Sequence, residues 1–118
     1  MARLVDMLEM RLNPMGANAK KMFGGVCFML SGNMVAGTFR DGALFRAGPD
    51  FAAEAAKRPE ARLMEMNGRI AAGYWIVPEE KLDAKTFDYW LDAAIAFNAT
   101  LPAKIEGAKK KPTSRKTV

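Results

Sequence analysis

Residues 34–47, MVAGTFRDGALFRA, decide the fold, because two apolar runs flank the dipeptide Asp41-Gly42. Asp-Gly between apolar runs is the strongest short-range signal of a β-hairpin, since both loop positions favour positive φ. We therefore expect two antiparallel strands, over residues 34–40 and 43–47, that are joined by a tight turn.

A third apolar run precedes this hairpin. Residues 22–30 are predicted to form one strand, which ends at the turn-forming residues 31–33. The three strands then make an antiparallel meander. A two-residue loop at Asp41-Gly42 places Thr38 opposite Phe45 in the register of the hairpin.

Outward from the meander, local signals predict the remaining elements. These are a helix that ends near Leu12, a short helix over residues 50–57 that is capped by Asp50, strands at residues 62–66 and 73–77, and a helix that follows the N-cap Asp83 and ends before Leu101-Pro102. The predicted order is αβββαββα, an α+β domain of an antiparallel meander and two further strands with N- and C-terminal helices.

Alternation along the meander sorts its side chains onto two faces, and neither face is polar. One face is predicted to hold Val26, Phe28, Leu30, Val35, Phe39 and Leu44, and the other Cys27, Met29, Met34, Ala36, Phe45 and Ala47. An antiparallel sheet that is solvated on one side alternates with polar residues, so this sheet is expected to be covered on both sides.

The first and last helices are expected to cover one of these faces. We interpret the second face as the interface of a homodimer or of a regulatory protein partner, with Cys27, Met29, Met34 and Phe45 as its candidate residues. The alternative is that the middle and terminal helices wrap both faces within one chain.

The net charge of +5 is distributed unevenly. Residues 1–102 hold twelve basic and twelve acidic side chains, so a neutral domain is predicted there, with no footprint for a polyanion. Residues 103–118 are predicted to form a basic, disordered tail with one acidic residue, Glu106. Its six cations are Lys104, Lys109, Lys110, Lys111, Arg115 and Lys116. They are candidates for nonspecific binding to DNA or RNA, and a solubilising end without a partner is the alternative.

Composition excludes several kinds of chemistry. The chain has no histidine and one cysteine, Cys27, so it lacks the usual general base and cannot build a zinc site of Cys and His ligands. Residues 37–42 have the two glycines of a phosphate loop but lack the lysine that must follow. We therefore predict no catalytic residue, cofactor or metal. Arg40 and Arg46 flank the hairpin and are candidates for contact with an anion, with surface ion pairs as the alternative.

Two further expectations concern Gly24-Gly25 and the location of the protein. Glycines inside a strand mark a bulge or the close approach of another backbone. Charged residues interrupt the apolar residues of the N-terminus, and the chain has no apolar run of the length that spans a bilayer. We expect a cytoplasmic protein that does not enter a membrane.

Several stretches together resemble the N-terminal domain of the TfoX (Sxy) family of bacterial competence regulators. They are residues 20–26, 33–37, 39–48, 66–69 and 73–77, with Met-Phe-Gly-Gly and Phe-Arg-Asp-Gly as the most specific motifs. The resemblance covers about residues 3–104. It implies an α+β domain that is often dimeric and a non-enzymatic role in transcriptional regulation of transformation genes, together with a cyclic-AMP-dependent activator. The full-length regulators carry a C-terminal domain, so a stand-alone copy without it is expected.

Overall fold

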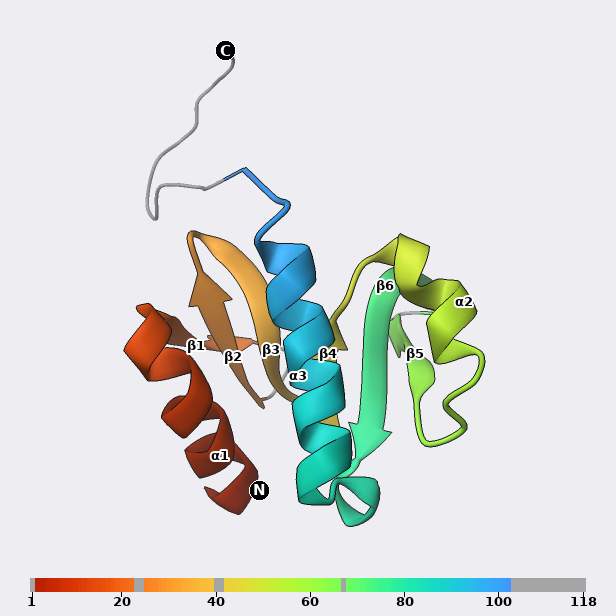
Figure 1. Cartoon of the computed structure of the whole chain (residues 1–118), viewed down its shortest axis with the longest axis horizontal. Coiled ribbons are helices and arrows are strands. Elements are labelled where there is room, and N and C mark those ends of the chain that lie inside the picture. The colour runs from red at the N-terminus through yellow and green to blue at the C-terminus, as the bar shows by residue number, and fades with distance from the viewer. Residues whose placement is uncertain (1, 23–24, 40–41, 67, 103–118) are drawn as a thin grey trace.

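A computed structural model describes residues 2–22, 25–39, 42–66 and 68–102, which form one six-stranded antiparallel sheet and three α-helices (Figure 1). The strands are β1 (Asn18–Met22), β2 (Gly25–Leu30), β3 (Asn33–Phe39), β4 (Gly42–Arg46), β5 (Arg62–Met66) and β6 (Arg69–Pro78). The helices are α1 (Ala2–Leu12), α2 (Ala52–Ala55) and α3 (Ala84–Asn98), with 3-10 turns η1 (Asn13–Met15), η2 (Pro49–Phe51) and η3 (Glu79–Lys81). The strands lie in the order β1-β2-β3-β4-β6-β5.

The predicted α+β class is confirmed, and the sheet contains one strand more than expected. Residues 22–30 were predicted as a single strand, but the described chain forms β1 and β2 on either side of residues 23–24. β1 lies at an edge of the sheet and carries Lys20 and Lys21, the kind of charge that keeps an edge from pairing with another chain. Because an edge strand of this kind is polar, its sequence resembles a loop.

The turn of the central hairpin lies one residue earlier in the chain than predicted, and the pairing of its two strands changes with it. Phe39 pairs with Gly42 and Thr38 pairs with Ala43, so the connection is residues 40–41 and Thr38 does not face Phe45. Gly42 serves the sheet in another way. A Cβ atom at Gly42 would lie 2.4 Å from the carbonyl oxygen of Val77 in β6, so glycine is required by the close approach of a neighbouring strand.

A bulge in β3 explains why the predicted faces are partly wrong. Phe28 pairs with Ala36 while the next residue of β2 pairs with Met34, so Val35 is an extra residue in β3. The extra residue reverses the alternation beyond it. Phe39 and Leu44 therefore lie with Cys27 and Met34, whereas Ala36, Phe45 and Ala47 lie with Phe28 and Leu30.

The two faces of the sheet carry two separate apolar clusters. The helix-side cluster joins Phe28, Val35 and Phe45 of the sheet to side chains of all three helices. The helix-free cluster consists of strand residues only, which are Cys27, Met34, Phe39, Leu44, Met64 and Ile76. The helices thus lie on one face of the sheet (Figure 1), and the alternative in which helices wrap both faces is wrong for the described residues.

Local signals explain the two long helices well. Leu4, Leu8 and Leu12 of α1 are buried at helical spacing and pack on the sheet. The N-cap predicted at Asp83 is confirmed, because its side chain accepts a 2.8 Å hydrogen bond from the backbone N–H of Thr86. This bond lowers the pKa of Asp83.

The middle helix and β6 differ more from their predicted forms. The helix expected over residues 50–57 is the turn η2 followed by the single turn α2, and Asp50 lies inside η2 instead of capping a helix. β6 extends over ten residues, from Arg69 to Pro78, because β5 and β4 pair with its two sides. None of the helices described is long and apolar enough to cross a membrane.

Candidate functional site

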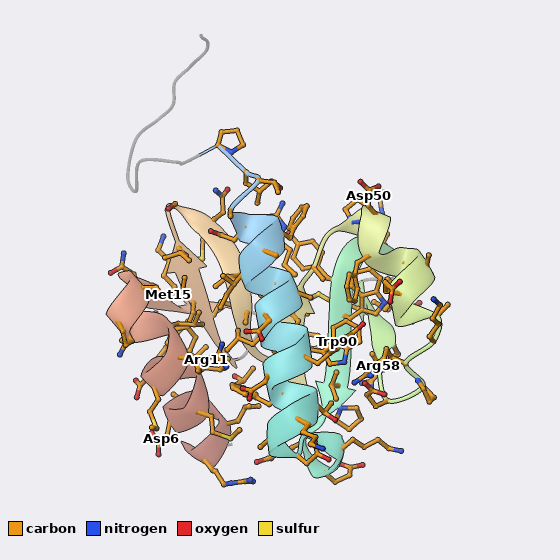
Figure 2. The ribbon with its side chains drawn as sticks, in the orientation of Figure 1. Asp6, Arg11, Met15, Asp50, Arg58 and Trp90 are labelled. Carbon is orange, nitrogen blue, oxygen red and sulfur yellow. The ribbon has the colours of Figure 1, made fainter. Side chains whose placement is uncertain are left out.

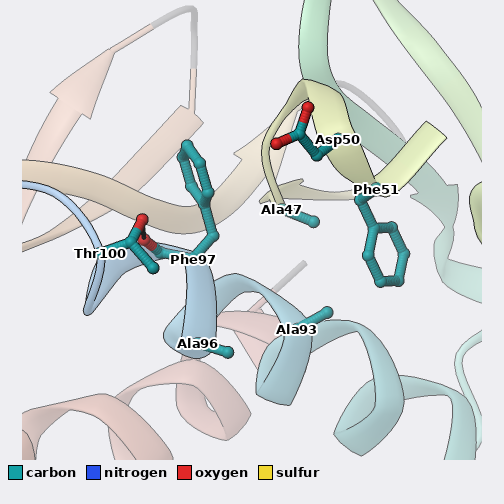
Figure 3. A pocket seen from close by; sticks show the side chains of 7 residues that line it. All are labelled: Ala47, Asp50, Phe51, Ala93, Ala96, Phe97 and Thr100. Carbon is teal, nitrogen blue, oxygen red and sulfur yellow. Dashed lines mark hydrogen bonds between the residues drawn. The ribbon is translucent and has the colours of Figure 1, made fainter.

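A groove of about 320 Å³ lies between the C-terminal half of α3 and the corner where β4 continues into η2 (Figure 3). We call it the α3–η2 groove. It is lined by Ala47, Asp50, Phe51, Ala93, Ala96, Phe97 and Thr100. These residues come from two segments, 47–51 and 93–100, that are far apart in the sequence, so the groove exists only when α3 is packed on the sheet.

Small residues and one glycine give the groove its shape. Ala47, Ala93 and Ala96 keep its walls low, while Phe51 and Phe97 stand on either side (Figure 3). The chain enters η2 through Gly48, which has a φ of 91°. A Cβ atom at Gly48 would lie 2.4 Å from the ring of Phe97, so a larger residue there would displace this wall.

The chemistry of the α3–η2 groove is that of an apolar binding surface. Asp50 is its one ionisable side chain. The hydroxyl of Thr100 donates a 2.7 Å hydrogen bond to the backbone carbonyl of Phe97. The lining therefore has no nucleophile paired with a base, and it suits the burial of an apolar side chain from a partner.

The predicted anion contact at Arg46 has a different environment. The guanidinium carbon of Arg46 lies 5.3 Å from the ring centre of Tyr74 and 5.5 Å from that of Phe97. These are cation–π distances, so the side chain is held against two aromatic rings beside the groove. Arg40 lies outside the described residues, and the structure therefore does not join the two arginines in one described site.

A second, smaller groove of about 200 Å³ lies between α1 and the beginning of α3. Its lining consists of Met7, Met10, Arg11, Ala84, Phe87 and Asp88. Arg11 spans the two helices (Figure 2) and forms ion pairs of 2.6 Å with Asp88 and 2.7 Å with Asp92. Met10 beside it is 78% exposed, which leaves a flexible apolar side chain at the rim.

A polar cluster on the other flank of α3 fixes the segment that leads into β5. The indole N–H of the buried Trp90 donates a 3.0 Å hydrogen bond to the carboxylate of Glu60, and Arg58 donates a second of 2.9 Å. Arg58 also stacks on Tyr89, 3.9 Å from its ring centre, and Figure 2 shows Arg58 beside Trp90. Burial opposes the charge of Glu60, but the hydrogen bonds from Trp90, its own backbone and Arg58, with the charge of Arg58, outweigh burial and lower its pKa.

This cluster stabilises the fold by holding the segment before β5 against α3. The sequence did not predict it. A carboxylate with a lowered pKa stays ionised near neutral pH and is a poor general acid or base. Trp90 and Trp75 are both buried. A tryptophan with a buried ring needs a partner for its N–H, but nothing local in the sequence indicates Glu60, thirty residues earlier.

The structure does not bring the four candidate interface residues together on one surface. Cys27 and Met34 are buried in the helix-free cluster and Met29 packs against it, whereas Phe45 is fully buried on the helix side. The grouping is therefore corrected, because the bulge at Val35 reverses the face of Phe45. Burial raises the pKa of Cys27 to about 11, as expected of an unreactive core thiol.

The other predicted sites have simpler outcomes. Gly25 is confirmed as a place where another backbone comes close, since a Cβ atom there would lie 2.4 Å from the carbonyl oxygen of Thr38. Gly24 and the six cations of residues 103–118 lie outside the described residues. Within residues 2–22, 25–39, 42–66 and 68–102, no three Cys, Asp or Glu side chains are grouped so as to hold a metal ion.

The fold defines a small α+β domain in which the α3–η2 groove is lined mainly by apolar residues. Comparison with protein families then gives its class, because residues 12–98 match the family model of the TfoX N-terminal domain. The chain belongs to this family, in agreement with the resemblance noted in the sequence. No curated protein and no solved structure shows a significant match to the chain.

Proposed function

We propose that this protein is a non-enzymatic interaction module that acts in transcriptional regulation in the cytoplasm, and that the α3–η2 groove receives an apolar side chain of a regulatory protein partner. The observation that carries the proposal is the groove itself, whose walls are alanines and two aromatic rings and whose one ionisable side chain is Asp50. Membership of the TfoX N-terminal domain family supports a regulatory role.

The energetics favour a small but specific contact. Burial of one Leu- or Phe-sized side chain contributes about 1.5–3 kcal/mol. Phe51 and Phe97 line the groove, and aromatic residues of this kind are enriched at the centres of protein interfaces. A more specific form of the proposal is that the protein regulates competence. It predicts that the transcription of transformation genes changes when the groove is blocked.

The test is a complementation experiment in a strain that lacks the gene. Ala96 is an exposed residue of the groove, so Ala96→Arg fills the groove without disturbing the core. Ala53→Arg, at an exposed position of α2 outside the groove, is the matched control. We expect wild type and Ala53→Arg to restore transcription and transformation, and Ala96→Arg to fail. Complementation by Ala96→Arg, or a deletion without effect on any transcript, would overturn the proposal.

Self-association is a separate prediction. A homodimer remains expected from the family resemblance, but three of the four residues first assigned to its interface are buried within one chain. Light scattering after size exclusion measures the mass directly. A strict monomer at high micromolar concentration contradicts the dimer.

The alternative function is nonspecific binding of nucleic acid by the tail. Six basic residues against one acidic residue within residues 103–118 favour it. If the tail is the whole binding site, replacing all six of its cations by glutamine abolishes binding to duplex DNA at low salt. Unchanged binding of this tail-neutral variant rejects the tail as the site.

A further inference from the structure

The charges of the domain cancel in number but are segregated in space. The six strands hold five basic side chains, Lys20, Lys21, Arg46, Arg62 and Arg69, against one acidic side chain, Glu65. The described helices, turns and connections hold ten acidic and six basic side chains. Arg40 and Asp41, in the connection between β3 and β4, cancel each other. The strands thus carry a net positive charge, while the rest of the described chain carries a net negative charge of the same size.

The strand pairings show which face of the sheet carries these cations. Lys20 pairs with Cys27 and Arg62 with Ile76, and both partners belong to the helix-free cluster. Directly paired residues of an antiparallel sheet point to the same side, so Lys20 and Arg62 lie on the helix-free face.

Arg69 and Glu65 can be placed by the same reasoning. Arg69 is two positions before Ala71, which packs against the helix-free cluster, and it shares that face. Glu65 follows Met64 of this cluster, so it lies on the opposite side. The described strand positions of the helix-free face therefore include three cations, all exposed, and no acidic side chain.

The cations are spread across the sheet instead of being gathered at one point. β1 and β5, which carry Lys20 and Arg62, are the two edge strands of the six-stranded sheet. At about 4.8 Å between neighbouring strands, the two edges are about 24 Å apart along the surface of the sheet. A row of charges of this width matches an extended polyanion and not a single small anion.

The apolar part of the same face favours contact with a backbone over contact with bases. Phe39 and Leu44 are 2% and 0% exposed, and Tyr74 is stacked against Arg46. Proteins that bind single strands offer open aromatic rings on which bases stack, and the described residues of this face offer none. A duplex presents its phosphates outward and keeps its bases paired, so it needs only the cations.

We propose that the helix-free face of the sheet is a second, sequence-independent binding surface for duplex DNA, with Lys20, Arg62 and Arg69 in contact with its phosphates. The proposal goes beyond both functions above, because the surface belongs to the domain and acts without the tail. Affinity is then expected to depend strongly on salt, since each cation that neutralises a phosphate releases a counterion.

The experiment measures binding of a fluorescent DNA duplex at several salt concentrations, using the full chain in its tail-neutral form. The test variant adds Lys20→Gln and Arg69→Gln, at two exposed positions of the helix-free face. The matched control adds Lys81→Gln and Lys85→Gln, which remove the same charge from exposed positions in η3 and α3. Equal unfolding midpoints verify that all variants keep the fold.

We expect the tail-neutral protein to retain salt-dependent binding to the duplex. The slope of log K against log salt is negative, and the test variant should make it shallower by about 1.8, which is 0.9 for each lost phosphate contact. The control should leave the slope unchanged. Equal losses in test variant and control would show that net charge alone governs binding and would overturn the proposal. Absence of binding by the tail-neutral protein, or tighter binding of a single strand of the same sequence, would also overturn it.

Discussion

The side-chain amide of Asn98, in the last turn of α3, donates a 3.1 Å hydrogen bond to the backbone carbonyl of Leu30 at the end of β2. The same amide lies 3.4 Å from the carbonyl oxygen of Asn33, whose own amide donates a 2.8 Å bond to the carbonyl of Pro102. Two buried asparagines therefore join the end of α3 to the turn between β2 and β3. They hold the C-terminal half of α3, and with it the wall of the α3–η2 groove, in one position.

Asn98→Ala is expected to destabilise the fold by about 1–3 kcal/mol, because it leaves the buried carbonyl of Leu30 without its donor. Chemical denaturation followed by circular dichroism measures the loss. Asn13→Ala, at an exposed position of η1, is the control and should change stability by less than about 0.5 kcal/mol. Equal effects of the two substitutions would show that the buried amide does not stabilise the end of α3.

The cluster of Glu60, Trp90 and Arg58 predicts a pH-dependent contribution to stability. The pKa of Glu60 is lower in the folded chain than its usual value of about 4.3, so the folded state favours the charged form. The contribution is therefore complete above that usual value and is lost as the pH falls through the lowered pKa. We expect wild type to be more stable than Glu60→Gln at pH 7, and the difference to shrink steadily below about pH 4.

Unfolding curves of both proteins from pH 7 to pH 3 measure this difference. Glu54→Gln is the control, because Glu54 is exposed and its ion pair with the exposed Lys57 is long, at 3.7 Å. Its difference from wild type should stay near zero throughout. A Glu60→Gln difference that is constant with pH contradicts the prediction.

Gly37→Ala is expected to cost about 1–3 kcal/mol or to change the pairing of β2 and β3. A Cβ atom at this position would lie 2.4 Å from the carbonyl oxygen of Val26 and 2.8 Å from Cα of Cys27, and both are backbone atoms that cannot move aside. Gly68→Asn is the comparison, since Gly68 has a φ of 76° and open space around it, and asparagine tolerates that conformation. Thermal unfolding should show a clear loss for Gly37→Ala only.

Cys27 should resist thiol reagents in the folded protein. Its side chain is 0% exposed, and burial raises its pKa to about 11, so about one thiol in a thousand is ionised at pH 8. Labelling by a disulfide reagent is expected to be slow in buffer and rapid in concentrated guanidinium chloride. Labelling of the folded protein as fast as that of the unfolded chain would show that the helix-free cluster is open.

Local chemistry predicted those elements whose signals are contained within a few residues. Asp83 caps α3 because its carboxylate reaches an N–H three residues later. α1 ends at Leu12, where the chain continues into the 3-10 turn η1 with Pro14 in its first turn. The Asp-Gly signal identified the hairpin but misplaced its turn. Position 42 requires glycine because the backbone of Val77 comes close to it, and Val77 belongs to a strand much later in the sequence.

The candidate site could not be predicted in the same way. The α3–η2 groove joins Ala47 and Phe51 to Ala93 and Phe97, and no spacing in the sequence relates these pairs. The positive charge of the helix-free face could not be predicted from the sequence for the same reason. Counting along the chain gives a neutral domain, whereas pairing of the strands places three of the five cations of the sheet, Lys20, Arg62 and Arg69, on its helix-free side.

The amino-acid sequence by itself determined the α+β class, the apolar faces of the helices, the membership of the TfoX N-terminal domain family and the concentration of the excess charge in residues 103–118. The tertiary structure alone decided the bulge at Val35, the face on which Phe45 and Leu44 lie, the two grooves and the separation of charge between the strands and the rest of the described chain. The physical reason is the range of the interactions. Capping and periodic burial act between residues that are neighbours in the chain, whereas grooves, register shifts and charged faces arise from segments that meet only when the sheet is assembled.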